Sequence, residues 1–423
     1  MGFTLLRPWL ESRTRWEKVA LVVWSIVLLF VSVRVFIAPE AKTVYPIFSS
    51  TGVLWWSGAD LYEPGRPTSV QNGYRYSPTF AVFITPFALL PDFLGGVVWR
   101  LFSAAALLGS LLWVVRSVLP TTLSRDHFAW LLLLSLPLSL QSVNNGQANV
   151  LVIACMLAAV AAVKEERWNL ASLLITLAFV CKVYPLALGM LLILLYPRQL
   201  IWRIPLAVAA SLLVPFLCQH PVYVMDQYEK WLELLKHDDR SWIALEQTYR
   251  DLWLLIRLYG PAQDDQHWHL YRQLYMVLQV AAGAGIAAVC WQRQREGWSR
   301  EALLTSTLGL GAAWMMLLGP ATESSSFVLL APSLAWSVIE SLQAPEWRHR
   351  RILLWGSCAL FAVAVFLGGF SSAVKIHALG VHSWASLLYF TYLLTEPRAA
   401  AAASIAAAQT AESWRAEIGR AHV

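Results

Sequence analysis

Residues 173–195 read LLITLAFVCKVYPLALGMLLILL, an apolar run that carries one charge, at Lys182. A lysine placed in hydrocarbon costs about 2.5–3.5 kcal/mol on membrane-insertion scales. That cost is avoided if the ammonium group reaches the membrane interface or meets an anion. Tyr184 and the helix-breaking Pro185 follow the lysine. The stretch therefore predicts a polar site built at a break between apolar helices.

The composition of the whole chain agrees with a membrane protein. Of its 423 residues, 58% are hydrophobic and 14% are charged, whereas soluble domains carry about 25% charged residues. The net charge of +6 fits basic loops on the cytoplasmic side better than a nucleic-acid surface. The five cysteines lie in or beside apolar runs, which predicts neither a disulfide framework nor a cysteine metal site.

About twelve apolar segments approach the length of roughly 20 residues that a membrane-spanning helix requires. They lie near 18–37, 94–115, 127–143, 148–163, 168–183, 185–197, 202–218, 270–291, 302–318, 325–342, 352–370 and 380–395. The pattern predicts an all-α polytopic fold, with one integral-membrane domain over 1–398 and an Ala-rich tail over 399–423.

Segment 78–91 is apolar but shorter than these, and it contains Pro78, Pro86 and Pro91. A length of about 10–14 residues favours a re-entrant or interfacial element over a crossing. If this segment does not cross, the basic groups near 116–125, 164–167, 198–203, 293–300 and 348–351 all fall on the cytoplasmic side, as the charge bias of membrane proteins requires. Both termini are then cytoplasmic.

The same topology collects the polar features on the outer face. They are the outer loops 39–93 and 219–268, the polar island Asn144–Asn149, the stretch Lys182–Pro185 and the turn 319–324. Within the second loop, Val224–Leu235 has the pattern of an amphipathic helix on the membrane surface. The sequence thus predicts a site on the outer face of the cytoplasmic membrane.

Four stretches in order resemble a known family. They are Trp56-Ser57-Gly58-Ala59-Asp60-Leu61-Tyr62, Tyr74-Arg75-Tyr76-Ser77-Pro78, Asn145-Gly146-Gln147-Ala148-Asn149 and Lys182-Val183-Tyr184-Pro185. Together they resemble glycosyltransferase family 87, which has the GT-C fold and includes polyprenol-phosphate-mannose-dependent mannosyltransferases. The resemblance implies transfer of a hexose, mannose in the first place, from a polyprenyl-phosphate donor to a lipid or glycan acceptor.

The chain departs from the family at the residue that the resemblance would make the catalytic base. The family places an aspartate about four residues before a tyrosine, here Tyr45, and that position is occupied by Ala41. Glu40 is adjacent, and a further carboxylate, Glu323, lies in the late break Gly319–Ser326. Either the base has moved or the chain is an inactive member.

Stabilising a departing lipid phosphate requires cations where negative charge develops. Lys182 is the first candidate, with Tyr184 beside it, and its alternative role is that of a snorkelling lysine at a span end. Arg75, next to Tyr76, could hold the same phosphate in a bidentate manner, or it could be an ordinary interfacial arginine.

A carboxylate must take the proton of the acceptor hydroxyl. The outward candidates are Glu40, Asp60, Glu63, Asp226 and Glu323, of which Glu40, Glu323 and Asp60 are the predicted catalytic residues. Asp60 sits in a turn where aspartate commonly bonds its own backbone, and Glu40 could be a solvated loop acid. The side chains of Asn145, Gln147 and Asn149 suit sugar hydroxyls, although an asparagine there could instead cap a helix.

Other functions leave different signatures. We find no Gly-rich phosphate loop, no nucleotide-binding unit and no metal-ligand spacing in the sequence, so no cofactor, metal or nucleic acid is expected. The expected partners are the lipid-linked donor, the acceptor and membrane lipids. A multi-span transporter of a sugar or lipid-linked sugar is the rival interpretation, but carriers commonly show two similar halves, and no repeat is evident here.

Overall fold

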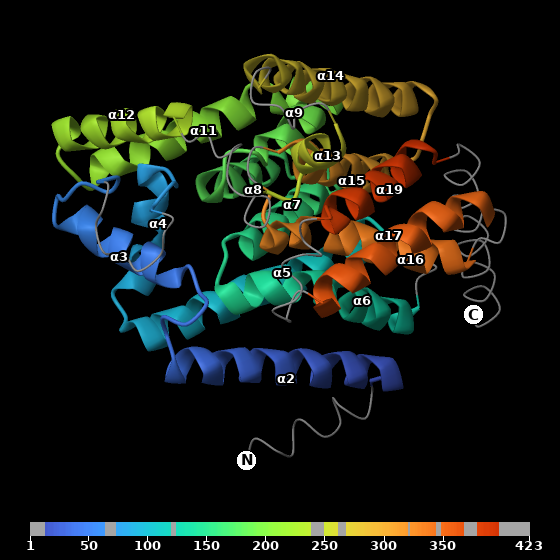
Figure 1. The fold of residues 1–423 in the computed structure, drawn as a ribbon, viewed down its shortest axis with the longest axis horizontal. Helices are drawn as coiled ribbons and strands as arrows, with labels where there is room; N and C mark the ends of the chain where they lie inside the picture. The colour runs from blue at the N-terminus through green and yellow to red at the C-terminus, as the bar shows by residue number, and fades with distance from the viewer. Residues whose placement is uncertain are drawn as a thin grey trace, which may run out of the picture.

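A computed structural model describes residues 13–63, 73–119, 124–237, 249–260, 268–319, 322–343, 348–367 and 379–396. All regular secondary structure within these ranges is helical (Figure 1). The first half contains α2 (Arg15–Ile37), α3 (Tyr45–Trp56), α4 (Pro78–Ala88), α5 (Asp92–Ser117), α6 (Arg125–Asn145), α7 (Asn149–Lys164), α8 (Trp168–Cys181), α9 (Leu186–Leu195) and α10 (Pro197–Leu200). The second half contains α11 (Arg203–Leu213), η1 (Val214–Leu217), α12 (Pro221–His237), α13 (Leu252–Tyr259), α14 (Trp268–Arg295), α15 (Arg300–Leu318), η4 (Ser324–Leu329), α16 (Ala331–Gln343), α17 (Arg348–Leu367) and α19 (Val381–Leu394).

Six helical stretches in the described ranges are long and apolar enough to cross a membrane. They are Arg15–Ile37, Asp92–Ser117, Pro197–Leu217, Leu270–Arg295, Arg300–Leu318 and Arg350–Leu367. Shorter apolar helices add Pro78–Ala88, Asn149–Lys164, Trp168–Cys181 and Leu186–Leu195. The prediction of an all-α membrane protein is confirmed, while the count of about twelve spans stays a prediction. The tail 399–423 lies outside the described residues.

Helix α7 lies in the interior of the molecule (Figure 1). Every residue from Asn149 to Val163 is buried. The helix is rich in alanine, and small residues let neighbouring helices approach closely inside a membrane protein. Helices α5, α8 and α15 and the short helix η4 all contact it. The start of α7, where the polar island ends, is therefore held at the centre of the fold.

The predicted outer loop 39–93 contains more helix than the sequence suggested. Helix α3 was not expected, because its residues lack a clear apolar stripe. Helix α4 begins after Ser77, whose side chain accepts a hydrogen bond from the backbone of Phe80, and it has a proline in its first turn. These are ordinary helix-start features. Helix α4 has 11 residues, which agrees with the predicted short segment. Its re-entrant path through the membrane stays a prediction.

The amphipathic helix predicted around Val224–Leu235 is confirmed as α12. Val224, Gln227 and Trp231 are buried along one side of it. The Gln227 carbonyl oxygen accepts from the backbone of Leu61, and the Trp231 indole donates to the carbonyl of Arg75. Helix α12 therefore fixes the stretch that carries Asp60 and the stretch that carries Arg75.

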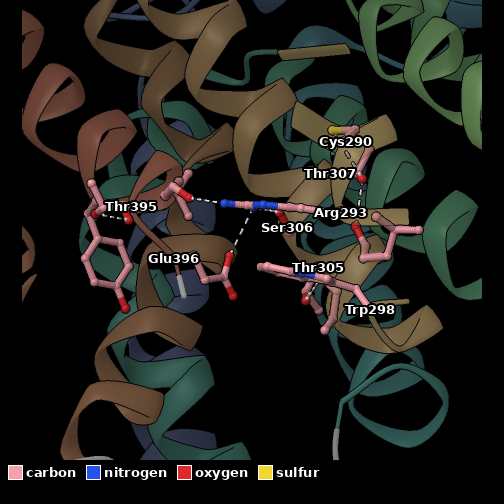
Figure 2. Close-up of polar contacts among 12 residues, drawn as sticks. Cys290, Arg293, Trp298, Thr305, Ser306, Thr307, Thr395 and Glu396 are labelled. Carbon is pink, nitrogen blue, oxygen red and sulfur yellow. Dashed lines mark hydrogen bonds and ion pairs between the residues drawn. The ribbon is translucent and has the colours of Figure 1, made fainter. Parts of the chain in front are cut away.

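A buried ion pair connects α14 to the end of the described chain (Figure 2). The Arg293 guanidinium lies 3.2 Å from the Glu396 carboxylate and donates to the carbonyl of Leu393 at 2.7 Å. It also bonds Ser306 of α15 and stacks on Trp298. The Arg293 side chain is only 5% exposed. One residue thus joins α14, α15 and α19.

Replacing Arg293 with alanine is expected to destabilise the fold strongly. Removing one partner of a buried pair leaves the other charge without compensation, which costs about 3–5 kcal/mol. Thermal unfolding in detergent should show a clearly lowered midpoint. Arg295→Ala, at an exposed arginine two positions along the same helix, is the matched control and should leave the midpoint nearly unchanged. Equal midpoints for the two variants would contradict a structural role for the pair.

Candidate active site

Polar side chains from separate stretches of sequence meet around Glu323. The Gln147 amide donates to the Glu323 carboxylate at 3.2 Å, and the Tyr184 hydroxyl donates to the Asn149 side-chain oxygen at 3.2 Å. The Lys182 ammonium lies 5.6 Å from the Tyr184 ring centroid and within electrostatic range of Glu323. We call Tyr76, Gln147, Asn149, Lys182, Tyr184 and Glu323 the polar cluster; Tyr76 belongs to it because its side chain lies within electrostatic range of Glu323 and Tyr184.

Lys182 occupies the break between two apolar helices. Helix α8 ends at Cys181, Lys182 has an extended backbone, and Pro185 precedes the first residue of α9. A proline cannot continue the preceding helix, because it lacks the amide hydrogen and restricts the residue before it. Among the described residues, no hydrogen bond or ion pair engages the ammonium group. The break therefore gives the polar cluster a cation whose charge is available to a ligand.

Glu323 is held in place from several directions. Its carboxylate accepts from Gln147 and from the Ser325 hydroxyl at 3.3 Å, and it caps the short helix η4 in a reciprocal arrangement with Ser326. The residue is partly exposed rather than sealed in the core. A carboxylate with a fixed orientation and access to the surface is suited to proton transfer.

The polar island is fixed through its main chain. Buried Arg100 of α5 donates to the Asn144 carbonyl at 3.1 Å and to Thr43, while Arg34 of α2 reaches the same carbonyl at 2.7 Å. The Asn145 carbonyl accepts from the Val44 amide and the Thr43 hydroxyl, both at 3.0 Å. The backbone of Asn145 therefore helps to hold the polar island in place.

The Asn149 side chain, which follows Gly146 by three residues, does not serve as a helix cap. Asn149 does not cap α7, because the cap position is Ala148, which makes no side-chain cap. Asn149 is fully buried, its oxygen accepts from Tyr184, and its amide nitrogen lacks a partner within the described part of the chain. Buried amide groups are rarely left unpaired. The capping alternative is therefore wrong for Asn149.

Gly146→Ala is expected to disturb the island. Gly146 has a left-handed backbone with φ +68°, and a Cβ there would lie 2.9 Å from the Arg100 guanidinium carbon. The backbone alone costs about 1–2 kcal/mol, and moving Arg100 would break its bonds to the Asn144 carbonyl and to Thr43. We expect a lowered unfolding midpoint and sugar transfer slowed about 10–100-fold through misplacement of the site.

Gly297→Ala separates these two effects. Gly297 has the similar φ of +76°, but a Cβ there would meet nothing within 4 Å. Gly297→Ala should therefore have the same backbone cost as Gly146→Ala and should leave the rate of sugar transfer unchanged. Equal transfer by the two variants would show that Arg100 does not position the island.

The remaining predicted site residues have other surroundings. Asp60 accepts from its own turn at the Tyr62 amide, 2.9 Å away, and pairs with Lys230 at 3.0 Å. The carboxylates of Asp226 and Asp60 raise the pKa of Lys230, so the Asp60 charge is already engaged. Glu40 is exposed in the turn after α2. Arg75 donates to the Gly73 carbonyl at 3.3 Å and interacts electrostatically with Tyr76.

The sequence interpretation missed two buried ionisable residues, Arg250 and Asp251. The Arg250 amide donates to the Thr322 carbonyl at 2.7 Å, which brings the backbone of Arg250 next to the residue before Glu323. Burial raises the pKa of Asp251 to about 7, although its carboxylate also caps α13. The only signal for them is an Arg-Asp pair directly before the apolar stretch Leu252–Leu255.

Apolar helices surround a carboxylate, a lysine and amide side chains. Together with the comparisons with known proteins, they define the class of the chain as a membrane glycosyltransferase. The model of glycosyltransferase family 87 matches residues 74–320, more than half of the chain, and the chain belongs to that family. The resemblance drawn from the sequence is thereby confirmed.

A relative from Mycobacterium tuberculosis (strain CDC 1551 / Oshkosh) is 26% identical over 373 residues, covering 85% of this chain and 78% of the relative. Its name is polyprenol-phosphate-mannose-dependent alpha-(1-2)-phosphatidylinositol pentamannoside mannosyltransferase. The family match includes Tyr76, Gln147, Asn149, Lys182 and Tyr184 and ends three residues before Glu323.

Proposed function

We propose that this protein transfers mannose from a polyprenyl-phosphate donor to a lipid or glycan acceptor. The observation that carries the proposal is the meeting of Lys182 and Glu323 in one polar cluster among apolar helices. The name of the mycobacterial relative, which specifies a polyprenol-phosphate-mannose donor and a phosphatidylinositol mannoside acceptor, supports it. The proposed location is the outer face of the cytoplasmic membrane, with both termini in the cytoplasm.

In the proposed reaction, the acceptor hydroxyl attacks the anomeric carbon of the sugar. Glu323 takes the hydroxyl proton, and the bond between the anomeric carbon and the phosphate oxygen breaks. The polyprenyl phosphate leaves with the bonding electrons, and Lys182 stabilises the charge that develops on it. Tyr76, and Arg75 beside it in the sequence, are the further proposed contacts to the phosphate.

The amide side chains have a separate proposed task. Gln147 orients Glu323 through their hydrogen bond, and Asn149 with Tyr184 offers a donor and an acceptor to sugar hydroxyls. Asn145 supports the island through its backbone. Glu40 is the second candidate base, because it neighbours Ala41 and its turn is tied to the island through Arg34. Asp60 is third, since Lys230 already engages it.

A transfer assay tests the proposal. Purified protein in bilayers receives radiolabelled polyprenyl-phosphate mannose and a membrane lipid extract as acceptor source. The expected result is label in a new, larger lipid or glycan product. Labelled free sugar on the far side of the bilayer would identify a carrier instead, and unchanged donor in the presence of a competent extract would identify an inactive member.

A further inference from the structure

Helix α13 packs against the end of α15, shortly before the break that carries the proposed base. The Trp253 ring of α13 lies 5.2 Å from the Tyr275 ring of α14, and both rings are buried with Leu317 and Leu318 of α15. The Tyr275 hydroxyl also donates to the Leu317 carbonyl at 3.3 Å. Helix α13 contacts α19 as well. This helix of eight residues is thus fixed to α14, α15 and α19 where α15 ends.

Hydrogen bonds hold the peptide unit that leads into Glu323 from both sides. The Arg250 amide, two residues before α13, donates to the carbonyl of buried Thr322 at 2.7 Å. The Glu323 amide donates to the Ser326 hydroxyl at 3.3 Å. The Thr322 carbonyl and the Glu323 amide belong to one planar peptide unit. Its orientation is therefore set jointly by the chain before α13 and by the short helix η4.

The Asp251 carboxylate fixes the start of α13 and, with it, the Arg250 amide. Asp251 is the N-cap of α13, and its carboxylate accepts from the Leu254 amide at 3.3 Å. The residue is only 5% exposed, so water competes little for this bond. A cap of this kind stabilises a helix start by about 1 kcal/mol. Without it, the first turn of α13 would fray, and the amide one residue before the cap would lose its fixed direction.

We propose that Asp251 is a positioning residue for the transfer reaction. Through its cap on α13 and the Arg250 amide, it sets the orientation of the peptide unit before Glu323, and with it the direction of the Glu323 carboxylate. This inference rests on the proposed function, in which Glu323 takes the proton of the acceptor hydroxyl. Asp251 acts through the main chain and not by proton transfer. Because a misplacement of about 1 Å can cost about 100-fold in rate, loosening this connection lowers turnover and leaves donor binding at Lys182 unchanged.

Two pairs of variants of the full-length protein test this role in the transfer assay. Asp251→Ala removes the cap, whereas Asp251→Asn keeps it, because asparagine caps a helix as well as aspartate does. Arg250→Pro removes the amide hydrogen, whereas Arg250→Ala removes the same side chain and keeps the amide. The first member of each pair should have a kcat about 10–100-fold below that of the second. The KM for the donor should be the same within each pair.

Hydrogen exchange gives a second readout that does not depend on activity. Backbone amides of η4 should exchange faster in Asp251→Ala and Arg250→Pro than in their partners. Thr14→Ala removes a cap of the same kind at the start of α2 and should change neither kcat nor this exchange. Equal kcat within both pairs, or a donor KM that rises as kcat falls, would overturn the proposal. Absence of transfer by the wild-type protein would instead overturn the proposed function, and the exchange would then still decide whether α13 holds the chain at Glu323 in place.

Discussion

Glu323→Gln is expected to lower the rate of mannose transfer at least about 100-fold, the lower end of what a positioned general base contributes. The amide cannot accept the proton of the acceptor hydroxyl, yet it keeps the shape of the side chain and one oxygen for its hydrogen bonds. Donor binding should persist for the same reason. The measurement is initial transfer rate at saturating donor, together with binding of the unreacted donor to the variant.

Two other carboxylates provide the comparison. Glu40→Gln changes an exposed acid next to Ala41, and Asp251→Asn changes a buried acid whose pKa is raised to about 7 by burial. Asparagine can still cap α13, so the second variant should fold. Both should retain most of the transfer rate. If Glu323→Gln kept full activity while Glu40→Gln or Asp251→Asn lost it, the catalytic base would be Glu40 or Asp251 instead.

Lys182→Ala should lower transfer about 100–1,000-fold, because one lost electrostatic contact to a developing charge has an effect of this size. It should also weaken donor binding, since the ammonium meets the phosphate in the ground state as well. Lys182→Arg keeps the charge and should recover part of the rate. The initial rate and the donor dissociation constant, measured for both variants, check this expectation.

A lysine away from the cluster controls for loss of surface charge. Lys236 is exposed on α12, and Lys236→Ala should transfer at the wild-type rate with unchanged thermal stability. If Lys182→Ala also transferred normally, Lys182 would be a snorkelling lysine at a helix end and the phosphate would bind elsewhere.

The local sequence was enough to find the helix breaks that form the proposed site. A proline after Lys182, a glycine inside the Asn-rich island and the polar break before Ser324 each interrupt apolar sequence, and each interruption ends a helix in the structure. Polar breaks inside a membrane protein are tolerated where they face one another or a cavity. Their convergence was therefore predictable from the chain.

Long-range partners could not be predicted in this way. Arg100 belongs to an apolar helix and bonds the Asn144 carbonyl across the fold, and Lys230 pairs with Asp60 from α12. Neither contact leaves a periodic pattern in the sequence. Helix α3 was missed because buried residues surround it on several sides, so the alternation that marks an amphipathic helix is absent.

A structure of the protein with a non-transferable polyprenyl-phosphate mannose analogue, such as a phosphonate, tests the central claim most directly. We expect the phosphonate within about 3 Å of the Lys182 ammonium, the distance of a charge-assisted hydrogen bond, with the anomeric carbon of the sugar facing the space next to Glu323. A phosphonate bound away from Lys182, or a sugar whose anomeric carbon faces Glu40 or Asp60 instead, would contradict it.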